Sequence, residues 1–304
     1  MFDDTMKGLT DLISNHGEFI YDIPLTDGVW TRGNMGLSHT RLKRILQVVS
    51  DISKKPLDTI KVLDLGSLDG QFSLEFAYHG SDVIGLEIRE DNVAKSNFCK
   101  DNLKLKNVQF IQDDVRNISV EKYGKYDVII CSGLLYHLTG YDSIELMPKM
   151  YEMTDNILIV DTHIALEPKD TWTTPSGKSY NGKTFTEHTA DESDDLKESR
   201  ILASSGNDDS FWFTRPSLVN LMLDSGFTSV YEAFGPPHLN FGQDGLEHID
   251  RCTFVAVKGS TKYLYTSPNA NTIEERFPEG SLSYGTNYDT TPTVESKKGS
   301  PGIW

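Results

Sequence analysis

Unbroken apolar runs alternate with amphipathic segments through residues 58–162. Runs such as 128–131 and 157–160 contain no polar position, which is typical of parallel strands that are buried on both faces. The pattern predicts strands near 60–65, 82–87, 108–112, 126–131 and 156–162, and helices at 39–53, 70–79, 90–103 and 142–154. Because strands and helices alternate with short links, we expect an α/β fold with a doubly wound, mostly parallel sheet.

The alternation stops after the fifth predicted strand. Residues 163–213 are polar and show little periodicity, and long irregular insertions in compact domains are commonly lids or binding loops. A helix at 215–225 and strands at 228–233 and 252–258 then complete seven strands. The last segment, 261–304, is rich in Pro, Gly, Ser, Thr and Asn, so we interpret it as a polar tail that follows the surface or is disordered.

Composition and charge limit the partners. The 304-residue chain has a formal net charge of −16, so it has no global attraction to nucleic acid phosphates, although a local basic cleft stays open. No apolar run reaches the roughly 18–20 residues of a membrane span. The N-terminus lacks the features of a secretory signal, and three cysteines without metal or redox spacing suit a reducing compartment. We therefore expect a cytoplasmic protein that does not act on membranes.

The stretch VLDLGSLDG at residues 62–70 combines a buried strand with a glycine turn. A turn of this kind lets a ligand approach the main chain, and an acidic residue about 20 positions later is placed to bind ribose hydroxyls. Glu87 ends the next predicted strand and meets that spacing. Position 68 is Leu, whereas a nicotinamide-binding turn favours a third glycine.

In order along the chain, VLDLGSLDG, VIGLE, VQFIQDDVRN and YDVIICSGLLYHL resemble the successive motifs of class I S-adenosylmethionine-dependent methyltransferases. The resemblance implies a Rossmann-like, seven-stranded sheet with a long insertion after strand five, and S-adenosylmethionine as cofactor. Asp113 and Asp114 are alternatives for the acid that binds the adenine amino group, and either residue is also a candidate helix cap. The other cofactor-binding residues that the resemblance implies are Asp64, Gly66, Ser67, Asp69, Gly70, Glu87, Ile88, Cys131, Ser132 and Gly133.

A narrower resemblance joins IPLTDGVWTRGN, GLLYHL and SFWFTRPSLVNLMLDSGFTSV to the family that contains the tRNA wobble-uridine carboxymethyltransferases. Those enzymes use a carboxylated donor and modify RNA. This chain departs from them in its strongly acidic charge and in the polar stretch 163–213. We therefore expect a small-molecule acceptor, with RNA modification and a non-catalytic cofactor-binding subunit as the alternatives. The sequence indicates no particular oligomeric state.

Methyl transfer to a hydroxyl needs a general base beside the aligned reactants. His163 follows the fifth strand, at the edge where doubly wound sheets bind ligands, and it is our first candidate. His137 is the second, with Tyr136 beside it to position the substrate. A packed or capping histidine is the alternative interpretation of each.

Three further groups are candidates for the site. Arg32 is a candidate to pair with the methionine carboxylate, with Trp30 beside it closing over the site, so segment 1–57 is expected to cover the cofactor and substrate. Phe211 and Trp212 are candidates to form a wall of the substrate pocket or to pack in the core. The acids near His188 form a local run that is typical of a solvated loop, and we expect no metal. The methyltransferase domain is expected over 58–260, with 163–213 as its lid-like insertion.

Overall fold

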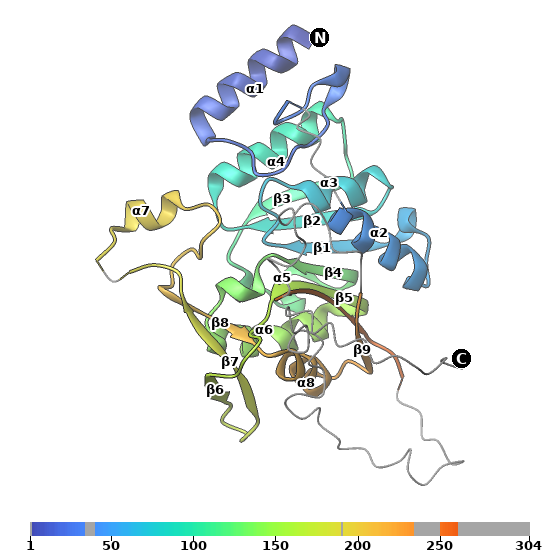
Figure 1. Ribbon diagram of the computed structural model, residues 1–304. Helices are drawn as coiled ribbons and strands as arrows, with labels where there is room; N and C mark the ends of the chain where they lie inside the picture. Colours follow the sequence, from blue (N-terminus) through green and yellow to red (C-terminus); the bar gives the residue numbers. More distant parts are fainter. Residues whose placement is uncertain (1, 34–39, 190, 234–249, 261–304) are drawn as a thin grey trace, which may run out of the picture.

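The computed structural model describes residues 2–33, 40–189, 191–233 and 250–260, so the predicted tail at 261–304 lies outside the described residues. A seven-stranded sheet of order β3-β2-β1-β4-β5-β10-β9 forms its centre (Figure 1). The strands β1 to β5 are parallel, and β10 runs antiparallel to β5 and β9. Its strands are β1 (Lys61–Leu65), β2 (Asp82–Glu87), β3 (Val108–Gln112), β4 (Tyr126–Ser132), β5 (Thr154–His163), β9 (Ser229–Glu232) and β10 (Arg251–Val257).

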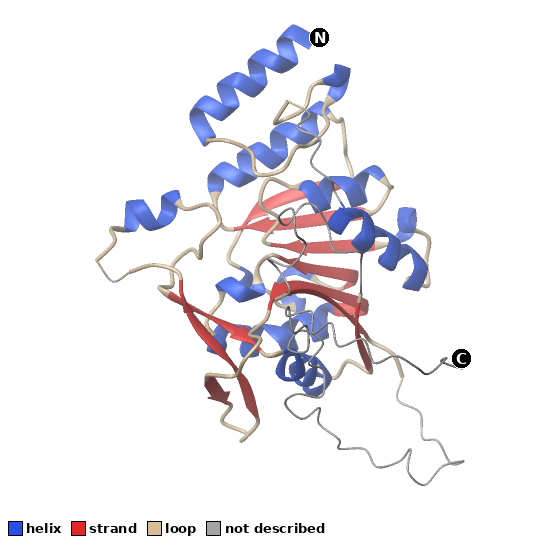
Figure 2. Cartoon of the chain, viewed as in Figure 1, coloured by secondary structure: helices blue, strands red, loops and turns tan. Residues whose placement is uncertain are grey.

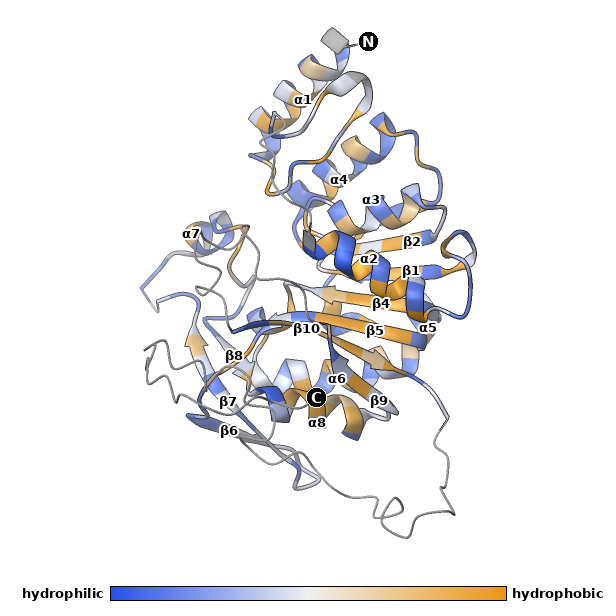
Figure 3. Ribbon diagram, turned by 45° about the vertical axis from the view of Figure 1, so that its right-hand side comes forward, coloured by the Kyte–Doolittle hydropathy of each residue, from blue (hydrophilic) through white to orange (hydrophobic). Residues whose placement is uncertain are grey.

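Helices cover both faces of this sheet (Figure 2). One face packs against α1 (Phe2–His16), α2 (Thr40–Ile52), α3 (Gln71–Tyr78) and α4 (Glu90–Asn102). The other face packs against α5 (Val120–Tyr123), α6 (Gly140–Met153) and α8 (Arg215–Ser225). Neighbouring residues of one strand enter opposite cores, Val62 one and Leu63 the other, because side chains alternate across a strand. This explains the unbroken apolar runs, which make the main strands the most hydrophobic part of Figure 3.

The expected α/β architecture with a mostly parallel seven-stranded sheet is confirmed. The expectation of little regular structure in 163–213 was wrong, since this stretch contains β6 (Asp170–Thr173), β7 (Ser179–Thr186), α7 (Asp194–Ser199) and β8 (Asp209–Phe213). The three strands form a small antiparallel sheet of order β6-β7-β8. All four residues of β6 are exposed, so it has no buried face to produce an alternating pattern. The Thr-rich and aromatic composition of β6 and β7 was the available signal.

The helix α1 was also not predicted. It packs through Leu9, which is 4% exposed, against the same face of the sheet as α4. Among the described residues, no helix combines the length and the apolar character that crossing a membrane requires.

Candidate active site

A cavity of about 500 Å³ opens at the carboxyl ends of β1, β2, β3 and β4. Ligands of doubly wound sheets bind at this edge, because the loops that follow parallel strands meet there. The N-terminal segment contributes Ile20 and Tyr21 to the wall, and the insertion contributes residues 201–205. The predicted cofactor-binding residues that line the cavity are Gly66, Ser67, Glu87, Ile88, Asp113, Asp114, Ser132 and Gly133.

The turn after β1 brings main-chain groups to the cavity. Gly66 and Gly70 have φ angles of 68° and 90°, and Leu68 between them has φ 52°, which is uncommon for a residue with a side chain. Leu68 is held there by Glu87, whose Oε2 accepts the Leu68 N–H at 2.9 Å. Oε1 of the same carboxylate accepts the N–H of Arg89 at 2.9 Å. Glu87 therefore joins the ends of β1 and β2 and fixes its own carboxylate at the cavity wall.

The polar groups of the wall fit the expected cofactor. Ser67 Oγ and Ser132 Oγ are buried and have no hydrogen-bond partner in the described part of the chain, and buried polar atoms without partners are rare in folded proteins. Glu87 keeps acceptor positions beyond the two that bind main chain, since an ionised carboxylate offers about four. Unpartnered hydroxyls and an available carboxylate suit a ligand rich in hydroxyl and amino groups, as S-adenosylmethionine is.

The two alternatives for the acid after β3 both reach the cavity but have different partners. Asp113 binds Lys122 Nζ at 2.5 Å and the Tyr123 hydroxyl. Burial raises the pKa of Asp113, but these hydrogen bonds outweigh it and hold the pKa at about 2. Asp114 caps the turn that follows β3 and pairs with the guanidinium of Arg116, at 2.9 Å from Nε and 2.6 Å from Nη2. Both carboxylates are ionised, and both alternatives stay open.

Four predicted cofactor-binding residues lie behind the cavity wall, namely Asp64, Asp69, Gly70 and Cys131. Asp64 is 2% exposed and its Oδ2 accepts the Ser73 hydroxyl at 2.6 Å. Asp69 Oδ2 accepts the N–H groups of Ile20 and Tyr21 at 2.7 and 2.9 Å. This carboxylate therefore links the N-terminal segment to the glycine turn and holds Ile20 and Tyr21, which line the cavity, in place.

Replacing Asp64 with Asn is expected to change how stability depends on pH. Burial raises the pKa of Asp64 from 3.8 to about 7, so between these values the folded state binds the extra proton and stability falls as pH rises. Asp64→Asn removes this loss, and the melting temperature without cofactor should exceed that of the wild type by several degrees at pH 8 but not at pH 4.

Thermal melts from pH 4 to pH 8 test this, with the exposed Asp101→Asn as the matched control. An Asp64→Asn curve parallel to that of the wild type would contradict the assignment of the buried proton to Asp64.

The predicted residues Trp30 and Arg32 do not line the cavity. Arg32 Nη1 donates to the Ile20 carbonyl at 2.9 Å, so it stabilises the fold of the N-terminal segment. Arg41 of α2 lines the cavity instead, and its Nη1 donates to Asp161 Oδ1 at 3.2 Å. Arg41 was not found from the sequence because its partner lies 120 positions away.

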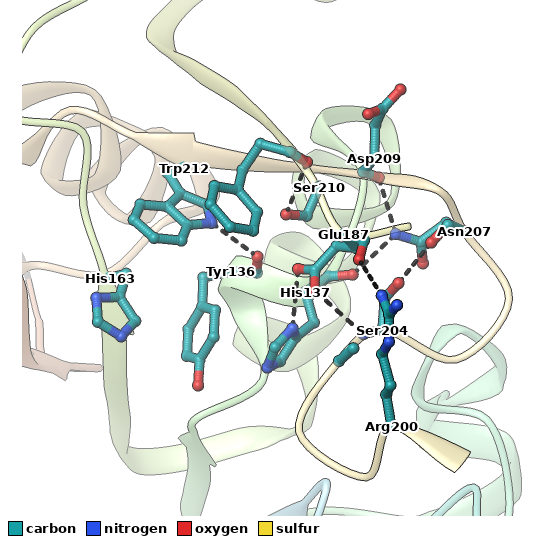
Figure 4. Close-up of polar contacts among 12 residues, drawn as sticks. Tyr136, His137, His163, Glu187, Arg200, Ser204, Asn207, Asp209, Ser210 and Trp212 are labelled. Carbon is teal, nitrogen blue, oxygen red and sulfur yellow. Dashed lines mark hydrogen bonds and ion pairs between the residues drawn. The ribbon is translucent and has the colours of Figure 1, made fainter. Parts of the chain in front are cut away.

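His163, the first candidate base, also lies outside the cavity lining. Its ring stacks on Trp212 at 4.9 Å and meets Tyr136 edge-on at 4.7 Å (Figure 4). Its Nδ1 lies 3.2 Å from Asp250 Oδ2, and its Nε2 lies 3.3 Å from Arg251 Nη1. With both ring nitrogens beside charged groups and both ring faces restricted, His163 is poorly placed to accept a proton from a ligand.

The two predicted pocket aromatics lie outside the lining too. Phe211 is 1% exposed and belongs to the core of the α6 and α8 face. Trp212 stacks between His163 and Phe185, and its Nε1 donates to the Tyr136 carbonyl at 3.1 Å. These two residues therefore attach the small sheet to the loop after β4, and they form no wall of the cavity.

His137 lines the cavity, as does Tyr136. His137 Nδ1 lies 2.9 Å from Glu187 Oε1, and the side chains are 16% and 5% exposed (Figure 4). Burial raises the pKa of Glu187, but the hydrogen bond and charge of His137 outweigh it and lower the pKa below its ordinary value. A carboxylate that binds one ring nitrogen fixes the tautomer and leaves the other nitrogen to act on a ligand. Glu187 was not found from the sequence, because it lies in the insertion, 50 positions from His137.

The insertion crosses the cavity and is attached on two sides. At the end of β2, Arg89 donates to the main-chain carbonyls of Glu198, Arg200 and Ala203 at 2.6, 3.2 and 3.1 Å. At the other side, Asn207 Nδ2 donates to the His137 carbonyl at 3.0 Å. Residues 201–205 between these attachments line the cavity. Over the described ranges, no group of three or more His, Cys, Asp and Glu side chains is arranged to hold a metal ion.

Comparisons with known proteins agree with this geometry. Residues 57–201 match the family model described as "Methyltransferase domain". A stretch of 84 residues, 28% of this chain, is 30% identical to the ubiquinone biosynthesis O-methyltransferase of Acinetobacter baumannii (strain AYE) and covers 35% of that protein. The match thus spans about a third of the length of the curated relatives.

Solved structures share the fold. The crystal structure of the N-terminal domain of EvdMO1 in the presence of SAH and D-fucose superposes with a TM-score of 0.61 at 18% identity, over 85% of this chain and 97% of that one. The same domain with SAH bound gives a TM-score of 0.61 at 19% identity, over 84% of this chain and 97% of that one. Residues 57–201 are thus similar to a methyltransferase domain, and S-adenosylmethionine is the cofactor.

Proposed function

We propose that this protein transfers the methyl group of S-adenosylmethionine to a hydroxyl oxygen of a small molecule, with His137 as general base. The observation that carries the proposal is the pairing of His137 with Glu187 at 2.9 Å, in a cavity that His137 lines together with Gly66 and Glu87. The O-methyltransferase that matches part of the chain supports an oxygen acceptor. Nitrogen methylation is the second choice, since an amine acceptor needs less help from a base.

Glu87 would bind the ribose hydroxyls of the cofactor, and Asp113 or Asp114 its adenine amino group. The hydroxyls of Ser67 and Ser132, which have no hydrogen-bond partner in the described chain, would form hydrogen bonds with the cofactor. When bound, the cofactor supplies an electrophilic methyl group on a sulfonium. Much of the acceleration then comes from alignment, because two reactants held in line need no further ordering.

The proton of the acceptor hydroxyl would go to Nε2 of His137. Glu187 holds the proton of Nδ1 and stabilises the imidazolium that forms, in the way that a buried carboxylate supports a catalytic histidine. Tyr136, whose ring lies 4.1 Å from that of His137, would position the acceptor. Residues 201–205 would keep water out of the cavity, with Arg89 holding them in place.

Release of S-adenosylhomocysteine from S-adenosylmethionine tests this function. The intact protein is incubated with a panel of phenols, catechols, hydroxy acids and sugars, and in parallel with unmodified tRNA. We expect turnover with members of the small-molecule panel and none with tRNA. Turnover with tRNA alone would favour the RNA alternative, and cofactor binding without turnover on either would favour the non-catalytic subunit.

A further inference from the structure

Positive side chains gather at the end of the cavity near β5 and β10. Arg41 and Arg251 both line the cavity, and both contact the same oxygen, Asp161 Oδ1, at 3.2 Å from Arg41 Nη1 and 2.7 Å from Arg251 Nη2. The other oxygen of Asp161 accepts the Thr253 hydroxyl at 2.6 Å, and Thr253 accepts Arg44 Nη2 at 3.0 Å. Three guanidinium groups thus surround one carboxylate.

The charge of this cluster is not balanced within the described part of the chain. Asp161 is 1% exposed; burial raises its pKa, but Arg251 and Arg41 outweigh this effect and keep the pKa below its ordinary value. Of the neighbouring acids, Glu232 pairs with Arg215, and Asp250 lies beside His163, 3.2 Å from its Nδ1. The guanidinium groups of Arg41, Arg44 and Arg251 thus face two carboxylates, those of Asp161 and Asp250. The arginines therefore keep a positive surplus inside a cavity of a strongly acidic protein.

Arg251 lies beside Gly133, which is predicted to bind the cofactor, and beside Tyr136, which is proposed to position the acceptor. A Cβ on Gly133, at the end of β4, would lie 3.5 Å from Arg251 Nη2, and Arg251 Nη1 lies 3.3 Å from the Tyr136 hydroxyl. Arg41 uses Nη1 for Asp161 and Nη2 for the Tyr21 hydroxyl. Counting partners in the described residues alone, three of its five N–H donors stay available to a ligand.

The cofactor does not neutralise the surplus. S-adenosylmethionine carries a sulfonium and an ammonium group against a single carboxylate, so its binding adds positive charge to the cavity. A buried cationic cluster is stabilised by an anion in hydrogen-bond contact, and guanidinium groups match carboxylate and phosphate geometry.

We propose that Arg41 and Arg251 bind an oxyanion of the acceptor, so that the acceptor is a small hydroxylated molecule bearing a carboxylate or a phosphate. Arg251 is then a specificity-determining residue that holds the anion beside the Tyr136 hydroxyl. This inference rests on the proposed function, because it assigns the acceptor of the same cavity.

The test uses matched pairs of ligands on protein saturated with S-adenosylhomocysteine. The pairs are salicylate with salicylamide, 3,4-dihydroxybenzoate with 3,4-dihydroxybenzamide, and glycerol 3-phosphate with glycerol. Calorimetry should give at least tenfold tighter binding of the anionic member in at least one pair, and the type of that pair distinguishes carboxylate from phosphate. Equal binding within all three pairs, or binding of none of the anions, overturns the proposal.

Variants assign the anion to Arg251. In Arg251→Gln the preference for the anion should disappear while the dissociation constant for S-adenosylhomocysteine stays within about threefold. Arg251→Lys, which keeps the charge but not the fork, should retain part of the preference and guards against misfolding of the Gln variant. Arg215→Gln removes another buried arginine, one outside the cavity, and should keep the preference whole.

Two further outcomes separate this inference from the proposed function. If the dissociation constant of Arg251→Gln for S-adenosylhomocysteine rises more than tenfold, the arginine binds the carboxylate of the cofactor. The inference is then wrong, while the proposed function stands. If the wild-type protein binds no S-adenosylhomocysteine, the proposed function itself fails.

Discussion

Glu87→Ala is expected to lower the affinity for S-adenosylhomocysteine at least about 100-fold. The carboxylate is expected to bind the ribose, and its two oxygens also accept the N–H groups of Leu68 and Arg89 at 2.9 Å each. Hydrogen bonds to a charged group contribute about 1.5–3 kcal/mol each, and 1.4 kcal/mol corresponds to a factor of ten. Loss of the carboxylate removes ligand contacts and releases Leu68 from its positive φ angle.

Isothermal titration calorimetry measures the effect, and Glu75→Ala is the matched control. Glu75 lies on the neighbouring helix α3, is 40% exposed and pairs only with His79 in the described chain, so its loss should leave the affinity within about twofold. An unchanged affinity in Glu87→Ala would place the cofactor elsewhere.

His137→Gln is expected to lower the turnover number by about 10²–10⁴ while cofactor affinity stays near that of the wild type. General base catalysis contributes an effect of that size, and glutamine cannot take the proton. Glu187→Gln should give a smaller loss and a changed pH–rate profile, because the carboxylate acts through the orientation and charge of the imidazole.

His163→Gln distinguishes the two candidate bases. Its ring is held by Trp212, Asp250 and Arg251, so the turnover number should fall by less than about tenfold. The rate of S-adenosylhomocysteine formation with the best acceptor of the panel is the measurement. A larger loss in His163→Gln than in His137→Gln would restore His163 as the base.

The main sheet could be predicted because its signal is local. Strands buried on both faces, such as β4 and β5, produce continuous apolar runs. The glycine turn is also a local signal, because Gly66 and Gly70 lie only a few positions apart in the sequence. The small sheet β6-β7-β8 escaped prediction because β6 is exposed throughout and buries no stripe of side chains. Tyr180, Phe211 and Phe213 of this sheet join the core that also contains residues of α6 and α8, and such contacts between distant segments cannot be read from a local pattern.

The candidate site divides in the same way. Of the residues that line the cavity, Glu87 was found from its spacing after the glycine turn, and Gly133 was found from the resemblance to known motifs. Residues that belong to the site through contacts between charged side chains were missed. Arg41, Glu187 and Arg251 lie 120, 50 and 90 positions from their partners in the sequence. The two candidate histidines show the same limit, since only the fold reveals that His137 lines the cavity and that His163 does not.

A crystal structure of the protein with S-adenosylhomocysteine tests the central claim most directly. The account predicts the ligand in the cavity at the ends of β1, β2 and β4, with its ribose hydroxyls bound to Glu87 and its sulfur on the side of Tyr136 and His137. A ligand bound outside this cavity, or one whose sulfur faces away from His137, would contradict the account.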